Sequence, residues 1–154
     1  MNMPVSCRAA SKDDIPEVLR LYAQPDLDNG NVLSLPDAER HLERIADYPD
    51  YKIYVAFCGT QLVGTFALLI MENLAHMGAP SAIIEDFAVD PEWQGRGIGT
   101  QMMQYAMRLC RDKGCYKAAL SSGLKREKAH AFYESLGFER HGYSYRINPQ
   151  AEPS

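Results

Sequence analysis

The chain has 154 residues, 46% of them hydrophobic, which fits one domain with a buried core rather than two independent domains. Its 16 Lys and Arg against 20 Asp and Glu give a net charge of −4, so general binding to nucleic acid or to an anionic membrane lacks an electrostatic driving force. No long apolar run or secretory leader is visible, and the four cysteines form no C-x-x-C pair, so we expect a cytoplasmic protein without a metal.

Hydrophobic periodicity predicts, in chain order, a strand, two short helices, three strands in succession, a helix, a strand, a helix and one or two final strands. The predicted strands are Val5–Ala9, Tyr51–Cys58, Gln61–Met71, Ser81–Val89, Lys117–Ser121 and Phe138–Ile147. The order predicts an α/β fold with a mixed, mostly antiparallel central sheet of six to seven strands flanked by four helices. We expect one domain over residues 1–154, with 148–154 as a disordered tail.

A glycine-rich string at residues 94–99 separates a predicted strand from a helix that begins at Ile98. Glycines let backbone N–H groups converge on one point, and the helix N-terminus adds a partial positive charge, so the string predicts a site for a pyrophosphate. A Rossmann loop would need glycine at Thr100 or Met102, and a Walker A loop would need G-K-[ST], so neither motif is present. An ordinary glycine-rich turn is the alternative.

The motif that does match is Q-x-x-G-x-G, at Gln94, Gly97 and Gly99, which resembles the acetyl-CoA loop of the GNAT N-acetyltransferase superfamily. The resemblance extends to flanking segments, Val89-Asp90-Pro91-Glu92 and Ala131-Phe132-Tyr133-Glu134-Ser135-Leu136-Gly137-Phe138, and covers about residues 50–147. It implies that acetyl-CoA is the co-substrate. Its pantetheine is expected to pair with the main chain of Phe87, Ala88 and Val89. Its pyrophosphate is expected to lie at Gln94, Gly95, Arg96, Gly97, Ile98, Gly99 and Thr100.

Acetyl transfer to an amine needs a base, because an ammonium group must lose a proton before its nitrogen can attack. Glu85 and Asp86 are consecutive acids inside an apolar run, where a charge without a purpose is costly. Side chains alternate along a strand, so only one of the two faces the cleft unless a bulge intervenes. We favour Glu85, whose position resembles that of the base in glucosamine-phosphate acetyltransferases. For Asp86 the alternative is to cap a core network or to pair with an arginine.

Tyr133 lies in the pattern Phe132-Tyr133-x-x-x-Gly137-Phe138, which resembles that of the superfamily tyrosine that protonates the leaving thiolate. Core packing on its helix is the alternative. Seven residues earlier, where many members have asparagine, this chain has Arg126. The basic loop resembles the subgroup that includes aminoalkylphosphonate acetyltransferases, and Arg126 is expected at a CoA phosphate, at an acidic acceptor, or at a solvated helix start.

These observations predict an acetyl-CoA-dependent N-acetyltransferase that acetylates a primary amine of a small molecule or peptide by direct attack in a ternary complex. The alternative is a catalytically silent acyl-CoA-binding sensor or scaffold, which would not need both Glu85 and Tyr133. The acceptor is expected at the loop 24–32, the second helix and the turn 72–81. The net charge favours a cationic acceptor and the basic loop an acidic one, so its identity stays open. A homodimer is compatible with the sequence.

Overall fold

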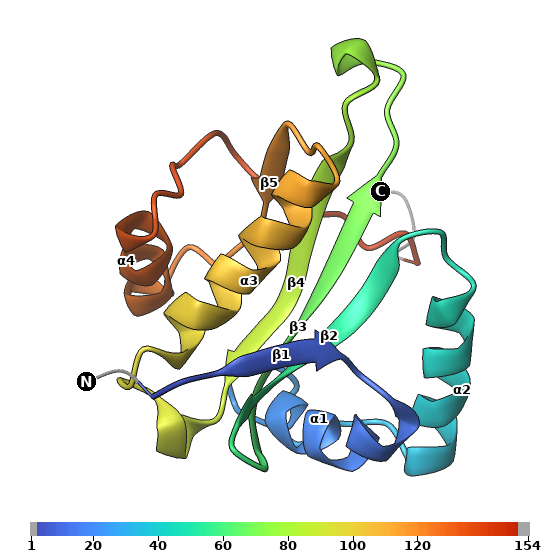
Figure 1. The fold of residues 1–154 in the computed structure, drawn as a ribbon, viewed down its shortest axis with the longest axis vertical. Helices are drawn as coiled ribbons and strands as arrows, with labels where there is room; N and C mark the ends of the chain where they lie inside the picture. The colour runs from blue at the N-terminus through green and yellow to red at the C-terminus, as the bar shows by residue number, and fades with distance from the viewer. Residues whose placement is uncertain (1–2, 151–154) are drawn as a thin grey trace. The chain divides into compact units, whose positions relative to one another are not determined.

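The structure is a computed structural model that describes residues 3–150 (Figure 1). The chain divides into two compact units, Met1–Leu120 and Ser121–Ser154. The first unit contains the whole β-sheet and three α-helices, and the second contains the last helix. The single domain over residues 1–154 therefore stays a prediction. Of the predicted disordered tail, residues 151–154 lie outside the described part of the chain.

The sheet contains five strands in the order of the chain, β1 to β5. Their bounds are β1 Ser6–Ala9, β2 Tyr51–Cys58, β3 Gln61–Met71, β4 Ser81–Val89 and β5 Lys117–Ala119. Neighbouring strands are antiparallel except β4 and β5, which are parallel. The α-helices are α1 Ile15–Tyr22, α2 Leu35–Ala46, α3 Ile98–Asp112 and α4 Glu127–Ser135. The predicted mixed, mostly antiparallel sheet and four helices are confirmed. No helix of residues 3–150 has the length and apolar character needed to cross a membrane.

The prediction of six to seven strands is wrong, because the described residues form five. The segment Phe138–Ile147 contains no strand. Its large side chains Tyr143, Tyr145 and Ile147 alternate as in a strand, but they are 88%, 90% and 84% exposed. A strand is stabilised by cross-strand pairs and by burial of one face, and within the described second unit this segment has neither. The alternation of large side chains in this segment is therefore not sufficient evidence that a neighbouring strand pairs with it.

Helices α1 and α3 cover opposite faces of the sheet. Leu21 of α1 packs with Val55 of β2, which lies opposite Thr65 of β3. Gly64 points to the other face, because successive strand residues alternate. There it lies under Met102 of α3, so closely that a Cβ on Gly64 would come within 2.5 Å of the methionine sulfur. A glycine is therefore needed where α3 crosses β3.

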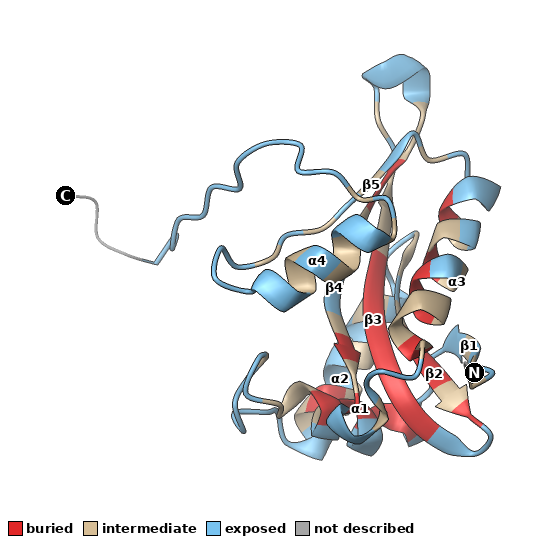
Figure 2. Cartoon of the chain, turned by 90° about the vertical axis from the view of Figure 1, so that its left-hand side faces the viewer, coloured by how far each residue is buried: buried red, intermediate tan, exposed pale blue. Residues whose placement is uncertain are grey.

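Burial is concentrated along β3, in which Leu62 to Leu68 are all buried (Figure 2). The neighbouring strand β4 differs, because its buried residues are interrupted by two exposed carboxylates, Glu85 and Asp86. Glu85 and Asp86 therefore lie next to β3, the most buried strand. The backbone conformation of β4 at these two residues determines where their carboxylates point.

Candidate active site

A β-bulge in β4 orients the two carboxylates. Glu85 lies opposite Ala67 of β3 and Ala88 lies opposite Thr65, so three steps along β4 match two along β3. Asp86 adopts the left-handed backbone conformation, with φ of 53°. Thr65 and Ala67 point to the same face, and their partners Glu85 and Ala88 must therefore do so as well. The sequence left open whether a bulge is present at this point, and the structure contains one. Strict alternation of faces therefore does not apply to Glu85 and Asp86.

The two carboxylates interact electrostatically with tyrosines and with a further acid. Partial removal of water by the surrounding protein raises the pKa of Asp86, and the nearby negative charge of Asp28, in the loop after α1, raises it further. Burial raises the pKa of Tyr22, as does the charge of Asp86. The pKa of Tyr51 is raised by burial and by the charges of Asp86 and Glu85. Asp86 thus lies close to α1, to its following loop and to the start of β2.

No Lys or Arg of residues 3–150 forms an ion pair with Asp28, Glu85 or Asp86. The alternative in which Asp86 pairs with an arginine is therefore wrong for this part of the chain. Asp28, Tyr22 and Tyr51 were not singled out from the sequence, because nothing local in an Asp- and Asn-rich loop or in a tyrosine-containing strand signals a shared site.

The ladder between β4 and β5 ends early. The parallel strand β5 pairs with β4 only at Ser81, Ala82 and Ile83. Ile83 is six residues before the end of β4, so the two strands part before the bulge. An extended ligand with amide groups can add to a strand edge of this kind by main-chain hydrogen bonds. The pairing of pantetheine with Phe87, Ala88 and Val89 stays a prediction.

The predicted anion loop connects β4 to α3 and has the backbone that its glycines permit. Gly95 and Gly97 adopt φ values of 77° and 78°, and Gly97 is the N-cap of α3. The first main-chain bond of the helix runs from the N–H of Gln101 to the carbonyl of Gly97, at 3.2 Å. The N–H groups of the preceding three helical residues therefore have no acceptor within the helix and can donate to an anion.

Two side chains of the loop contact the segment that precedes it. Gln94 Nε2 donates to the carbonyl oxygen of Val89 at 3.3 Å. The guanidinium of Arg96 lies 4.8 Å from the ring centroid of Trp93, the single tryptophan of the chain. Both Gln94 and Arg96 are exposed, as the predicted contact with a pyrophosphate requires.

An ion pair between residues far apart in the sequence fixes the start of the loop. Arg20 Nη1 of α1 lies 2.8 Å from Asp90 Oδ2, and the Asp90 side chain is only 6% exposed. The other oxygen of Asp90 accepts the N–H of Glu92 at 3.0 Å. Asp90 follows β4 directly, so this pair ties α1 to the chain entering the loop. In the sequence, Asp90 is part of a motif, whereas no local pattern signals Arg20.

We expect Arg20→Met to destabilise the first unit, because it leaves the buried Asp90 carboxylate without its cation. The loss in free energy of unfolding should be about 1–3 kcal/mol, the usual cost of an unsatisfied buried group. Urea denaturation measures it. The matched control is Arg40→Met, whose partner Asp37 is on an exposed turn of α2, where an ion pair contributes little. An equal loss in both variants would contradict the anchoring role.

Tyr133 and Arg126 belong to the second unit. The ring of Tyr133, in α4, lies 5.4 Å from that of Phe132 and 5.9 Å from that of Phe138, the latter edge to face. Burial raises the pKa of Tyr133, and the positive charge of Arg126 partly opposes this. The two predicted site residues are therefore near each other within their unit, and their roles stay predictions.

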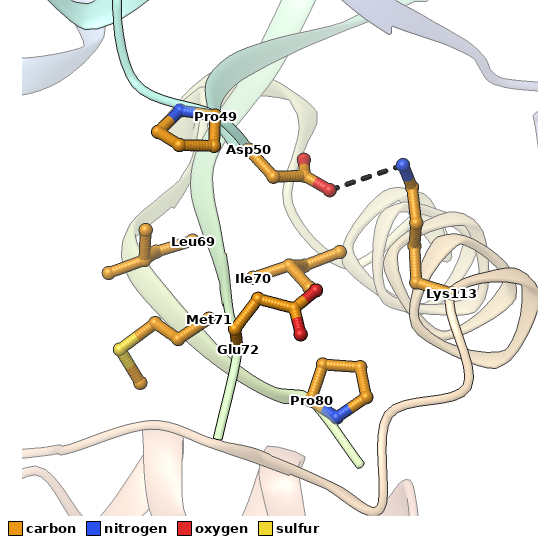
Figure 3. A pocket seen from close by; sticks show the side chains of 8 residues that line it. All are labelled: Pro49, Asp50, Leu69, Ile70, Met71, Glu72, Pro80 and Lys113. Atoms are coloured by element: carbon orange, nitrogen blue, oxygen red, sulfur yellow. Dashed lines mark ion pairs between the residues drawn. The ribbon is translucent and has the colours of Figure 1, made fainter. Parts of the chain in front are cut away.

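A pocket of about 370 Å³ lies elsewhere in the first unit (Figure 3). It is lined by Pro49, Asp50, Leu69, Ile70, Met71, Glu72, Pro80 and Lys113. Lys113 Nζ lies 3.3 Å from Asp50 Oδ2 across it. These residues lie just before β2 and β4, at the end of β3 and just after α3, whereas the glycine-rich loop joins the opposite ends of β4 and α3. The pocket contains none of the predicted catalytic or cofactor-binding residues, but its Glu72 and Pro80 belong to the turn 72–81, one of the segments expected at the acceptor.

The structure combines a strand edge, a glycine-rich loop at a helix N-terminus and two carboxylates at a bulge, which is the class of site that the sequence predicts for an extended pyrophosphate-containing ligand beside a base. Residues 16–138 match the sequence profile of the acetyltransferase (GNAT) family, and the chain belongs to this family. The family predicted from the sequence is thereby confirmed.

Three relatives illustrate the similarity. The glucosamine 6-phosphate N-acetyltransferase of Trypanosoma brucei brucei is 36% identical over 88 residues, 57% of this chain and 58% of that protein. The aminoglycoside N(6')-acetyltransferase type 1 of Stenotrophomonas maltophilia is 32% identical over 76 residues, 49% of this chain and 50% of that protein. The solved structure of a Trypanosoma brucei acetyltransferase superposes with a TM-score of 0.76 at 28% identity, over 94% of this chain and 99% of that one. The matches cover 58%, 50% and 66% of the length of three curated relatives, and between 26% and 41% of three others.

Proposed function

We propose that this chain is an acetyl-CoA-dependent N-acetyltransferase that acetylates a primary amine by direct attack in a ternary complex. The observation that carries the proposal is that two carboxylates stand at a bulge of β4, between the end of its ladder with β5 and an anion loop at the N-terminus of α3. Acetyl-CoA presents the matching features in the same order, a thioester, amide groups and a pyrophosphate.

In the proposed reaction, a carboxylate at the bulge takes a proton from the ammonium group of the acceptor, directly or through water. The amine nitrogen attacks the thioester carbonyl carbon, and the C–S bond then breaks. The leaving thiolate takes a proton from the phenol of Tyr133, and the nitrogen loses its second proton to water, which returns a proton to the phenolate. We propose Glu85 as the base, on its resemblance to the family position. Asp86 is the competing candidate, because a raised pKa makes a carboxylate a stronger base.

The acceptor that fits best carries positive charge. Asp28, Glu85 and Asp86 have no Lys or Arg partner among the described residues, so a cationic ligand would neutralise them. The names of the relatives include an acetyltransferase for aminoglycosides, which carry several ammonium groups, and one for glucosamine 6-phosphate, which carries a phosphate. Of these two substrates, the charge of this site favours the aminoglycoside type.

The test is release of the CoA thiol from acetyl-CoA, followed with a thiol-reactive dye in the presence of an aminoglycoside, a linear diamine or glucosamine 6-phosphate. We expect release to require an amine and to be faster with the cationic acceptors. Binding of acetyl-CoA without release by any amine in a broader panel would favour the silent sensor or scaffold instead.

Tyr133→Phe should lower kcat on the order of 10²-fold, because it removes the proton donor for the thiolate and leaves helix packing nearly intact. The affinity for acetyl-CoA should change little, since the bond strengthens only as the thiolate forms. Steady-state kinetics and an acetyl-CoA titration measure the two quantities. Tyr145→Phe is the matched control, since Tyr145 is 90% exposed in the same unit. Full turnover in Tyr133→Phe would identify Tyr133 as a packing residue.

A further inference from the structure

The carbonyl oxygen of Val89, the last residue of β4, accepts two side-chain amides. One is Gln94 Nε2 of the glycine-rich loop and the other is Gln24 Nε2, just after α1, each at 3.3 Å. A carbonyl oxygen has two lone pairs. Its hydrogen-bonding capacity is therefore filled by two glutamines that are 70 residues apart in the sequence.

This carbonyl points away from β3. The next N–H along the chain, that of Asp90, donates to the Val63 carbonyl of β3 at 2.8 Å. In a trans peptide the C=O of one residue and the N–H of the next point in opposite directions. The Val89 oxygen therefore lies on the edge of β4 that faces β5, beyond the point where the ladder between these strands ends at Ile83.

Gln24 also belongs to the loop expected at the acceptor. Its own carbonyl oxygen accepts the N–H groups of Leu27 and Asn29, both at 3.0 Å, so the loop folds around the Gln24 backbone. The same loop carries Asp28, whose charge raises the pKa of Asp86. Gln24 thus connects the edge of β4 with a loop whose charge acts on a candidate base.

We propose that Gln24 is a positioning residue that couples acetyl-CoA binding to the loop 24–32. This inference rests on the proposed function, in which an amide of pantetheine pairs with the edge of β4. Because both lone pairs of the Val89 oxygen are in use, an incoming amide displaces one glutamine. Gln94 lies in the anion loop and stays beside the ligand, and Gln24 is the group that leaves. Acetyl-CoA then releases the loop that carries Asp28, and by thermodynamic linkage acetyl-CoA and an acceptor held by that loop change each other's affinity by the same factor.

The experiment is a titration of the wild-type protein, Gln24→Leu and Gln24→Met with acetyl-CoA, followed by the fluorescence of Trp93. Both substitutions keep the side-chain volume and remove the competing amide. We expect the Kd for acetyl-CoA to fall about two- to tenfold, the equivalent of one net hydrogen bond. The Kd for 3'-phosphoadenosine 5'-diphosphate should not change, since this half of CoA lacks the pantetheine amides. If Gln24 has only a structural role, its substitution should weaken the binding of both ligands or of neither.

The matched control is Gln104→Leu, an exposed glutamine on α3, which should leave both affinities unchanged. Equal acetyl-CoA affinity in the wild type and in both Gln24 variants would overturn the inference, and so would weaker binding in these variants. Tighter binding in Gln94→Leu instead of Gln24→Leu would show that the other glutamine leaves. If none of the proteins, the wild type included, binds acetyl-CoA, the proposed function itself fails.

Discussion

Glu85→Gln is expected to lower turnover by roughly 10² to 10⁴ at neutral pH, the usual span for the loss of a general base. The amide has nearly the shape of the carboxylate but cannot take a proton from the ammonium group. The loss should shrink at high pH, where the amine deprotonates without help. Steady-state rates of CoA release across the pH range measure this, with melting temperatures taken on the same preparations.

Asp86→Asn is the paired variant, and we expect it to lower turnover less than Glu85→Gln does. If it is the more damaging at every pH while the protein stays folded, the base is Asp86 and the preference for Glu85 is wrong. The two variants are well matched, since both residues are exposed and belong to the same bulge.

The pH profile separates the two candidates independently. The negative charge of Asp28 raises the pKa of Asp86, so Asp28→Asn should lower that pKa. A base works only when deprotonated, and the acidic limb of kcat/KM would then move to lower pH if Asp86 is the base. If Glu85 is the base, we expect the limb to stay within experimental error of the wild type.

Gly97→Val is expected to abolish the stabilisation of the fold by acetyl-CoA. Ligand binding to the wild type should contribute about 2.7 kcal/mol at 100 times its dissociation constant. Gly97 has φ of 78° at the N-cap of α3, a conformation that a β-branched residue adopts only under strain, and the added side chain would stand among the N–H donors. Thermal unfolding with and without acetyl-CoA measures the shift.

The control is Gly59→Val, in the turn between β2 and β3, where φ is 59° and a Cβ would meet no atom within 4 Å. Both variants carry the cost of a strained backbone, on the order of 1–3 kcal/mol. Only Gly97→Val should lose the response to acetyl-CoA. A normal melting shift in Gly97→Val would reject the assignment of the loop.

Local signals in the sequence predicted most of the first unit. The predicted bounds of Tyr51–Cys58, Gln61–Met71 and Ser81–Val89 are those of β2, β3 and β4, because apolar runs separated by turn residues are a short-range pattern. The start of α3 was equally predictable, since a glycine before an amphipathic run marks a helix N-terminus by its own conformational freedom. The strand predicted over Phe138–Ile147 was wrong. The alternation of Tyr143 and Tyr145 indicates which side chains share a face, but it does not indicate whether another strand pairs with the segment.

The sequence by itself determined the family and the groups of the proposed site, the glycine-rich loop and two adjacent carboxylates. Only the tertiary structure decided how they are arranged. The register of β4 against β3 produced the bulge, which depends on pairing between strands. The bonds of Arg20 to Asp90 and of Gln24 to Val89 join residues 70 and 65 positions apart. Such long-range contacts form when tertiary packing brings distant segments of the chain together, and no local sequence pattern predicts them.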